Sequence, residues 1–434
     1  MTTADYTVSQ GGEYNKVLTI HNINTSGAAV PIEGNIISAT DQEGDSVIVT
    51  DSISCVAATS GAINGSDWGD DVDGELKNYY KDEATNTVTY YVDFTSNYEA
   101  ANLVIPATVT DGGKTYSVRI GPMAFGNPTY QNNYLTGSLT ISDGVSYIGE
   151  AAFIGQAGLT GLLTIGSSVT FIGGSAFMKC SNLTGDIEIP DSVTEIGESA
   201  FEDCEDFGGT LTIGNSVTSI GDNAFKGCDS LIGDIEIPNG VTEIHDSTFE
   251  DCGSFNGTLT IGNSVTSIGE NAFKSCYGLT GNLVIPNSVV SIGVQAFYNC
   301  INLGSTEEKS LTIGSGVTSL GYQAFFGTGF VKTAPTSLQD GKICKDERGV
   351  YYLKNGSTYY CFGKAANVTN SGDFPSGTIA IEQGTKFICD KAFDGCSAVG
   401  GSFINPRWCY LNRRVRICKL FWLHNNRRKP HNPR

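Results

Sequence analysis

The sequence predicts an α/β repeat solenoid with a small β-rich region at its N-terminus, and three observations lead to this fold class. Phenylalanines recur every 24 residues through the middle of the chain, and a last one follows at a spacing of 28. Whole columns of apolar residues accompany them, as expected for an array of repeated structural units. A longer period of 48 residues lies on top of this repeat. The regularly spaced phenylalanines are Phe153, Phe177, Phe201, Phe225, Phe249, Phe273, Phe297 and Phe325.

Each repeat is expected to form one coil, and the array to contain about ten 24-residue coils. The consensus reads L-T-G-x-[LI]-x-I-[PG]-x-S-V-T-x-I-G-x-x-A-F-x-x-C. Its [LI]-x-I segment has the period of a strand, with two apolar residues inward and one residue outward. V-T-x-I predicts a second short extended piece. Ala200, Phe201 and Cys204 share one face at helical spacing, which predicts about two turns of helix.

The 48-residue superperiod indicates duplication of a two-coil unit. DIEIP occurs at 186–190 and 234–238, and TLTIGNSVTSIG occurs at 210–221 and 258–269. One column runs Glu202, Lys226, Glu250, Lys274. Equivalent residues of adjacent coils lie about 5 Å apart, and like charges at that distance would repel. We therefore predict a ladder of alternating charge along one face.

Composition excludes several classes of protein. The 434 residues carry 26 Lys and Arg against 46 Asp and Glu, a formal net charge of −20, which argues against a nucleic-acid partner. No apolar run is long enough to cross a membrane. The first residues, MTTADYTVSQ, lack the basic and apolar regions of a signal peptide.

The string [IL]-P-x-S-V-T-x-I-G-x-x-A-F-x-x-C resembles the BspA-like class of leucine-rich repeats, and it recurs between about residues 135 and 330. Residues 88–125 look like the capping coil of such arrays, and 340–396 look like its inserted β-hairpin followed by a degenerate coil. The resemblance implies a right-handed leucine-rich-repeat solenoid with a strand-lined inner face. It also implies a secreted or surface-anchored adhesion protein. The extra glycine of this 24-residue unit departs from the commoner 23-residue repeat.

We divide the chain into four parts: a β-rich region and linker at 1–75, expected to be truncated; the solenoid with its capping coil at 76–330; the hairpin and degenerate repeat at 331–406; and a basic tail at 407–434. In the linker, Asp67, Asp70, Asp71, Asp73 and Glu75 only partly match a calcium loop, and we interpret them as solvated acids.

The tail differs from all that precedes it. It contains nine of the 26 basic residues and no acidic residue, so the rest of the chain carries 17 basic and 46 acidic residues. Codons can be chosen for Cys409–Arg414 that encode Val-Thr-Ser-Ile-Gly when shifted by one base, which restores the repeat. We therefore interpret 407–434 as the product of a frameshift and assign it no function. The alternative is a basic tail that contacts membranes or acidic polymers.

Candidate catalytic and metal-binding groups are scarce. Cysteines recur at one per coil from Cys180 to Cys300, without the clustered spacing of a metal site, and we interpret them as small buried core residues. Before the tail the only histidines are His21 and His245, and neither has a partner visible in the sequence. We expect no catalytic residue, no cofactor and no bound metal.

The outward residues of the strands are the remaining candidates for a site, because repeat proteins bind ligands on such extended surfaces. The candidate ligand-binding residues are Tyr147, Phe171, Thr164, Glu188, Thr212, Glu236 and Thr260. Tyr147 and Phe171 replace smaller residues in adjacent coils and are candidate anchors, although ordinary surface variation would also explain them.

We therefore expect a monomeric, non-enzymatic protein of the cell surface or extracellular space that binds host or community proteins or glycoproteins. A carbohydrate-binding module and a passive spacer that displays another domain are the alternatives.

Overall fold

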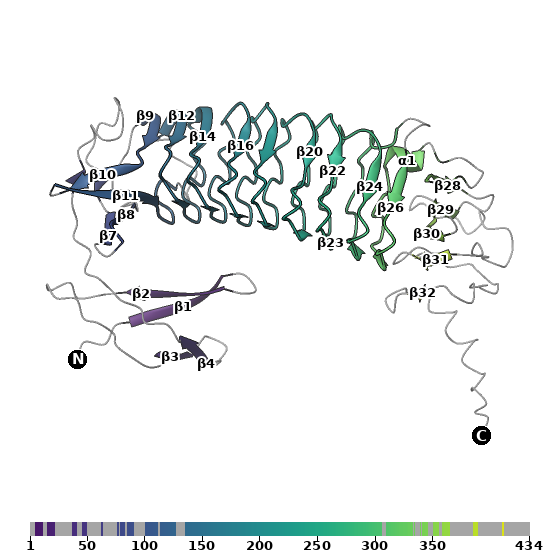
Figure 1. Ribbon diagram of the computed structural model, residues 1–434, viewed down its shortest axis with the longest axis horizontal. Helices are drawn as coiled ribbons and strands as arrows, with labels where there is room; N and C mark the ends of the chain where they lie inside the picture. Colours follow the sequence, from purple (N-terminus) through teal and green to yellow (C-terminus); the bar gives the residue numbers. More distant parts are fainter. Residues whose placement is uncertain are drawn as a thin grey trace, which may run out of the picture.

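The computed structural model describes side chains at 85–89, 101–110, 113–126, 135–305, 310–331 and in short stretches between 334 and 361. Elsewhere only the bounds of paired strands are given. The described solenoid has about 8 turns, and its coils follow one another along the long axis of Figure 1. It is a parallel β-solenoid with almost no helix, so the α/β class expected from the sequence is wrong in its helical part.

The first strand of each coil comes from the [LI]-x-I segment. Its two apolar residues are buried, except that Ile213 is half-buried, and the residue between them is exposed or half-buried, as at Ile187, Glu188 and Ile189. These strands pair in parallel with a shift of one repeat, so that Ile187 faces Leu211. They are β9 (Ala100–Ile105), β12 (Leu135–Ile141), β14 (Leu159–Ile165), β16 (Ile187–Ile189), β18 (Leu211–Ile213), β20 (Ile235–Glu236), β22 (Leu259–Thr260), β24 (Leu283–Ile285) and β26 (Leu311–Ile313).

The second strand comes from the V-T-x-I segment and forms a separate parallel ladder. Its last residue is buried in every coil from Ile148 to Leu320, and the residue before it is exposed or half-buried. The ladder is divided into two sheets. The first contains β11 (Lys114–Ile120), β13 (Tyr147–Ile148), β15 (Phe171–Ile172), β17 (Glu195–Ile196) and β19 (Ser219–Ile220), and the second contains β21 (Glu243–Ile244), β23 (Ser267–Ile268), β25 (Ser291–Ile292) and β27 (Ser319–Leu320).

A column of stacked phenylalanine rings forms the centre of the core. The rings run without interruption from Phe125 to Phe325, with centroids 5.1–5.4 Å apart and planes within 16° of parallel. All of them are almost fully buried. Each ring therefore gains both apolar burial and two ring contacts, which explains why the sequence retains phenylalanine in every coil.

The segment expected to be helical folds instead as successive β-turns. The amide of Ala200 donates to the carbonyl of Gly197, and that of Cys204 to the carbonyl of Phe201 (both 3.3 Å). The third residue of each turn, Ser199 or Asp203, has a positive φ of 55° or 58°. These are the left-handed positions of type II turns, which Gly, Asn and Asp tolerate best.

The backbone groups that a helix would use internally bind the next coil. The amides of Ser199, Phe201 and Asp203 donate to carbonyls one repeat ahead, each at 2.8 Å. A lone helical segment of two turns would leave most of its terminal groups unsatisfied, whereas this ladder satisfies them between coils. Hydrogen bonds between neighbouring coils thus favour the turns over a helix, although the apolar residues have helical spacing.

The cysteine column is buried, as predicted, and it also donates hydrogen bonds. Every thiol from Cys180 to Cys300 is fully buried, and its Sγ lies 3.0–3.1 Å from the phenylalanine carbonyl of the preceding coil. Gln156 occupies the same column and its Nε2 donates to the carbonyl of Phe125 at 2.5 Å. The position therefore requires a buried side chain that can donate a hydrogen bond, whether Cys or Gln. The sequence-based interpretation considered only the small size of cysteine and missed this requirement. Burial raises the pKa of Cys180 to about 12.

The 48-residue superperiod corresponds to pairs of coils joined by side chains. The Asp186 carboxylate accepts the amide (2.6 Å) and hydroxyl (2.9 Å) of Thr210 in the next coil. Lys226 Nζ donates to Glu202 (3.1 Å), and Lys274 Nζ donates to Glu250 (2.6 Å), which confirms the predicted charge ladder. In the described chain the first-strand sheet divides at the same boundaries, into β16–β18, β20–β22 and β24–β26.

The extra glycine of the repeat follows this two-coil alternation. Gly185 has a φ of +85°, which only glycine adopts without strain. Gly209, its equivalent in the next coil, lacks a positive φ, but a Cβ there would collide with the Asp186 carboxylate. Glycine is thus needed in both coils, for conformation in one and for close approach in the other.

The remaining strands lie at the two ends. β7 (Tyr79–Asp82), β8 (Thr87–Tyr90) and β10 (Thr108–Asp111) extend the second sheet beside β11, and β9 pairs with β12. Beyond the coils, the short helix α1 (Gly329–Lys332) precedes antiparallel β28 (Ile343–Lys345), β29 (Val350–Asn355) and β30 (Thr358–Lys364). β31 (Thr385–Ile388) and β32 (Tyr410–Leu411) follow in parallel.

Before the solenoid the structure gives β1 (Asp5–Gly11), β2 (Asn15–His21), β3 (Ile37–Thr40), β4 (Ser46–Val49), β5 (Ala62–Ile63) and β6 (Leu76–Lys77). They form three antiparallel pairs. The acidic segment at 67–75 lies outside the described residues, and so does the tail at 407–434 except for β32. The interpretation of the acidic segment as solvated and that of the tail as a frameshift product therefore stay predictions.

Candidate functional site

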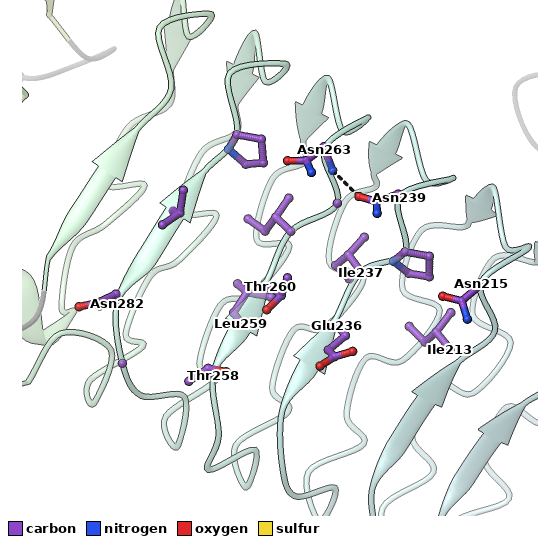
Figure 2. A pocket seen from close by; sticks show the side chains of 16 residues that line it. Ile213, Asn215, Glu236, Ile237, Asn239, Thr258, Leu259, Thr260, Asn263 and Asn282 are labelled. Carbon is purple, nitrogen blue, oxygen red and sulfur yellow. Dashed lines mark hydrogen bonds between the residues drawn. The ribbon is translucent and has the colours of Figure 1, made fainter.

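A shallow open groove crosses the first-strand sheet over β18, β20, β22 and β24, with a volume of about 670 Å³ (Figure 2). Its floor contains the outward side chains of three successive strands, Glu236, Thr260 and Val284. Val284 is 57% exposed, and it stands in a column that carries only Thr and Glu from Thr164 to Thr260. The groove thus joins an apolar end at Val284 to the polar side chains of the preceding strands.

The strand pattern creates this floor. In β22, Leu259 is buried and Thr260 points outward, because successive residues of a strand face opposite sides. Pro238 and Pro286 end the strands of their coils and also line the groove. Three parallel columns result. The central column is Thr164, Glu188, Thr212, Glu236, Thr260 and Val284; the leading column is Asp186, Thr210, Asp234, Thr258 and Asn282; the trailing column is Asp191, Asn215, Asn239, Asn263 and Asn287.

Asparagines of the trailing column form one rim of the groove. The backbone nitrogen of Asn263 donates to Asn239 Oδ1 at 2.9 Å, and the backbone nitrogen of Asn215 donates to Asp191 Oδ1 at 2.7 Å. The first of these bonds directs the side-chain oxygen of Asn239 toward the next coil (Figure 2). The side-chain NH₂ groups of Asn239 and Asn263 have no hydrogen-bond partner among the described residues, so each can donate two hydrogen bonds to a ligand.

The sequence analysis did not identify the asparagines of this rim, because the consensus leaves their position undefined between [PG] and S. They are Asn215, Asn239 and Asn263. The signal that could have found them is the recurrence of asparagine at one column in adjacent coils, since a turn alone would accept Ser, Asp or Gly as well.

The structure places five of the seven predicted residues in the central column. Thr164, Glu188, Thr212, Glu236 and Thr260 are all exposed, and the register sets Glu188 beside Thr212 and Glu236 beside Thr260. Glu236 and Thr260 lie in the groove, whereas the other three precede it along the solenoid.

Tyr147 and Phe171 lie on the other sheet, so the seven predicted residues do not form a single site. Their rings stack with centroids 5.0 Å apart and planes 6° from parallel. The Arg119 guanidinium lies over the opposite face of Tyr147, 4.9 Å from the ring centroid. Both faces of Tyr147 are therefore in contact with this chain. Burial raises the pKa of Tyr147 although Arg119 opposes the shift, so the phenol stays neutral near pH 7.

The described residues show no catalytic or metal-binding arrangement. His245 Nδ1 lies 3.6 Å from an Asp222 carboxylate oxygen at the surface. No group of three His, Cys, Asp or Glu side chains in the described parts could hold a metal ion. Within those same parts, no helix has the length and apolar character needed to span a bilayer.

Comparison with known proteins decides the family. The model of the BspA-type leucine-rich repeat region matches residues 119–252 and 209–332 with 6 copies. The chain belongs to the BspA-type leucine-rich repeat family through this region. No curated protein matches it.

Several solved bacterial structures are similar to this BspA-type protein. A leucine-rich cell surface protein from Faecalibacterium prausnitzii is 25% identical, covering 81% of this chain and 97% of that one, with a TM-score of 0.44. A leucine-rich repeat protein from Bacteroides ovatus is 23% identical over 79% and 88% of the two chains, with a TM-score of 0.42. The pneumococcal vaccine antigen PcpA is 16% identical over 82% and 100%, with a TM-score of 0.29.

Proposed function

We propose that this BspA-type protein is a non-enzymatic binding protein, displayed on or released from the cell surface, that recognises extracellular proteins through the groove on its first-strand sheet. The observation that carries the proposal is a groove that joins the exposed Val284 to the rim of Asn239 and Asn263 and to the hydroxyls of Thr258 and Thr260 in the preceding coils. Binding sites of this kind join an apolar contact to a few fixed polar groups.

Rigidity supports the same proposal. The groove residues stand on strands that are bonded to neighbouring coils, and the phenylalanine ladder fixes the spacing of those coils. A ligand that binds such a preformed surface does not have to order it first, which leaves more of the contact energy for affinity. The proposed surface location rests on the BspA-type repeat family, which is associated with the cell surface.

The carbohydrate alternative rested on Tyr147 and Phe171. Sugars stack on the faces of aromatic rings, and here Arg119 and Phe171 already cover both faces of Tyr147. The geometry of this pair therefore favours a structural role, and the protein-binding proposal does not use it.

The test is binding of the full chain to immobilised extracellular glycoproteins, each measured before and after enzymatic removal of its sugars. We expect saturable binding that survives deglycosylation. Binding that disappears with the sugars would replace the proposal with the carbohydrate module. The absence of any saturable binding would leave the spacer as the better account.

A further inference from the structure

The first-strand face carries a stepwise gradient of negative charge that leads into the groove. Across the leading, central and trailing columns, the coil of β16 has three carboxylates and the coil of β20 has two, whereas those of β18, β22 and β24 have none. The five carboxylates are Asp186, Glu188, Asp191, Asp234 and Glu236. No Lys or Arg occupies any of the three columns in these coils. One end of the surface is therefore anionic and the other is neutral with an apolar centre.

The five carboxylates differ in their availability. Asp186 and Asp234 accept hydrogen bonds from threonines of the next coil, and these bonds hold the pKa of each below its usual value, so both remain charged. Glu188 and Glu236 have no hydrogen bond or ion pair among the described side chains, and both are exposed. They lie two coils apart, about 10 Å at strand spacing, on either side of Thr212. These two are the carboxylates that a ligand can engage.

We propose that the groove and this acidic approach form one binding track for an extended protein segment that carries Lys or Arg at one end and small apolar or hydroxyl side chains at the other. This inference rests on the proposed function and specifies the partner's chemistry. The basic end lies over Glu188 and Glu236, and the apolar end lies over Val284. The asparagine rim donates hydrogen bonds to backbone carbonyls of the segment between them. Polyanions such as nucleic acids or sulfated glycans are repelled by the same surface.

The opposite sheet provides a control for charge alone. Glu243 is also exposed, but it stands in the second strand of its coil and outside the groove. Substituting it with Gln changes the net charge of the chain by the same amount as a substitution at Glu188 or Glu236. If substitutions at Glu188 or Glu236 weaken peptide binding and Glu243→Gln does not, the binding depends on the track and not on the net charge of the chain.

The probe is a short synthetic peptide of Thr and Val with two lysines at one end, and its partner is the same peptide with glutamates in place of the lysines. Binding of each to the full chain is measured by titration calorimetry at low and high salt. We expect only the lysine peptide to bind, with an affinity that falls as salt rises. Glu188→Gln and Glu236→Gln should each bind it about two- to threefold more weakly, because exposed ion pairs contribute modestly. Glu243→Gln should bind it like the unmodified chain.

Equal binding of the two peptides, or an equal loss with Glu243→Gln, would overturn the inference. The outcome is separable from that of the proposed function. If the full chain binds extracellular proteins and the lysine peptide neither binds nor competes, the track is wrong and the binding function stands. If the chain binds none of those proteins, the proposed function fails as well.

Discussion

Lys226 lies between two carboxylates in the charge ladder, and its reversal to glutamate is the sharpest test of how the coils hold together. Glu202 precedes it and Glu250 follows it, each one coil away, and their side chains are only 14% and 11% exposed. The hydrogen bond that Lys226 donates to Glu202 raises the pKa of Lys226, so Lys226 is charged at neutral pH. Lys226→Glu would place three carboxylates in a row about 5 Å apart.

The magnitude follows from that spacing. Each like-charge pair at about 5 Å costs about 1–3 kcal/mol for effective dielectric constants between bulk water and a protein surface. Loss of the ion pair adds up to about 1 kcal/mol. With side chains that bend partly away, we expect Lys226→Glu to destabilise the solenoid by about 2–4 kcal/mol. For a domain of this size that lowers the Tm by roughly 5–10 °C.

Lys274→Glu is the matched control, because Lys274 has Glu250 on one side and Tyr298 on the other. It creates one repulsive contact instead of two, so its Tm should fall by about half as much. The Tm of both variants is measured by circular dichroism at low and high salt. High salt should reduce the difference in Tm between each variant and the unmodified chain. Equal changes in the two variants, or no change in either, would refute the alternating ladder as a source of stability.

Three further predictions follow from the core and the turns. Because burial raises the pKa of the column thiols, with Cys180 at about 12, they should react with a thiol reagent at pH 8 only after denaturation. Rapid labelling of any thiol from Cys180 to Cys300 in the native chain, located by peptide mapping, would contradict this. Asn223 has a φ of 56°, so Asn223→Val should destabilise by about 1–2 kcal/mol and Asn223→Gly should be neutral or stabilising; equal Tm values for the two would show that the turn is misassigned. Asp186 and Asp234 have lowered pKa values, so the stability they contribute is present above their ordinary pKa of 3.8 and is lost as pH falls through the lower folded value. Acid titration should show a smaller loss in Asp186→Asn/Asp234→Asn than in the unmodified chain, and identical acid profiles would exclude these two groups.

The sequence predicts the periodic features of this fold well. Apolar alternation in [LI]-x-I places Ile187 and Ile189 inward and Glu188 outward, because a strand admits no other arrangement. The Lys226–Glu202 contact also follows from the repeat alone, since equivalent residues must be neighbours in a stacked array.

The helical expectation failed for a reason that the apolar pattern cannot show. Ala200, Phe201 and Cys204 have helical spacing, but inward side chains at successive β-turns produce the same spacing. The deciding signal was the polar column between them, where Asn, Asp and Gly recur at the left-handed positions, as at Asn223 and Gly227.

The site was predicted in part. Strand alternation predicts the outward residues of the central column. It does not predict the groove beside Val284, because the groove depends on how the coils stack. The contact of Arg119 with Tyr147 could not be foreseen either, since the two residues are 28 apart and Arg119 belongs to the irregular first coil.

The central claim is that the groove is the binding surface, and Val284 tests it most directly. Val284→Arg fills the groove with a long cationic side chain, whereas Val290→Arg makes the same change in the same coil directly before β25 and outside the groove, where Val290 is 48% exposed. The measurement is binding of both full-length variants to the deglycosylated extracellular proteins that the unmodified chain binds. We predict that Val284→Arg abolishes binding and Val290→Arg preserves it. Retention of full affinity by Val284→Arg, or an equal loss in both variants, would contradict the claim.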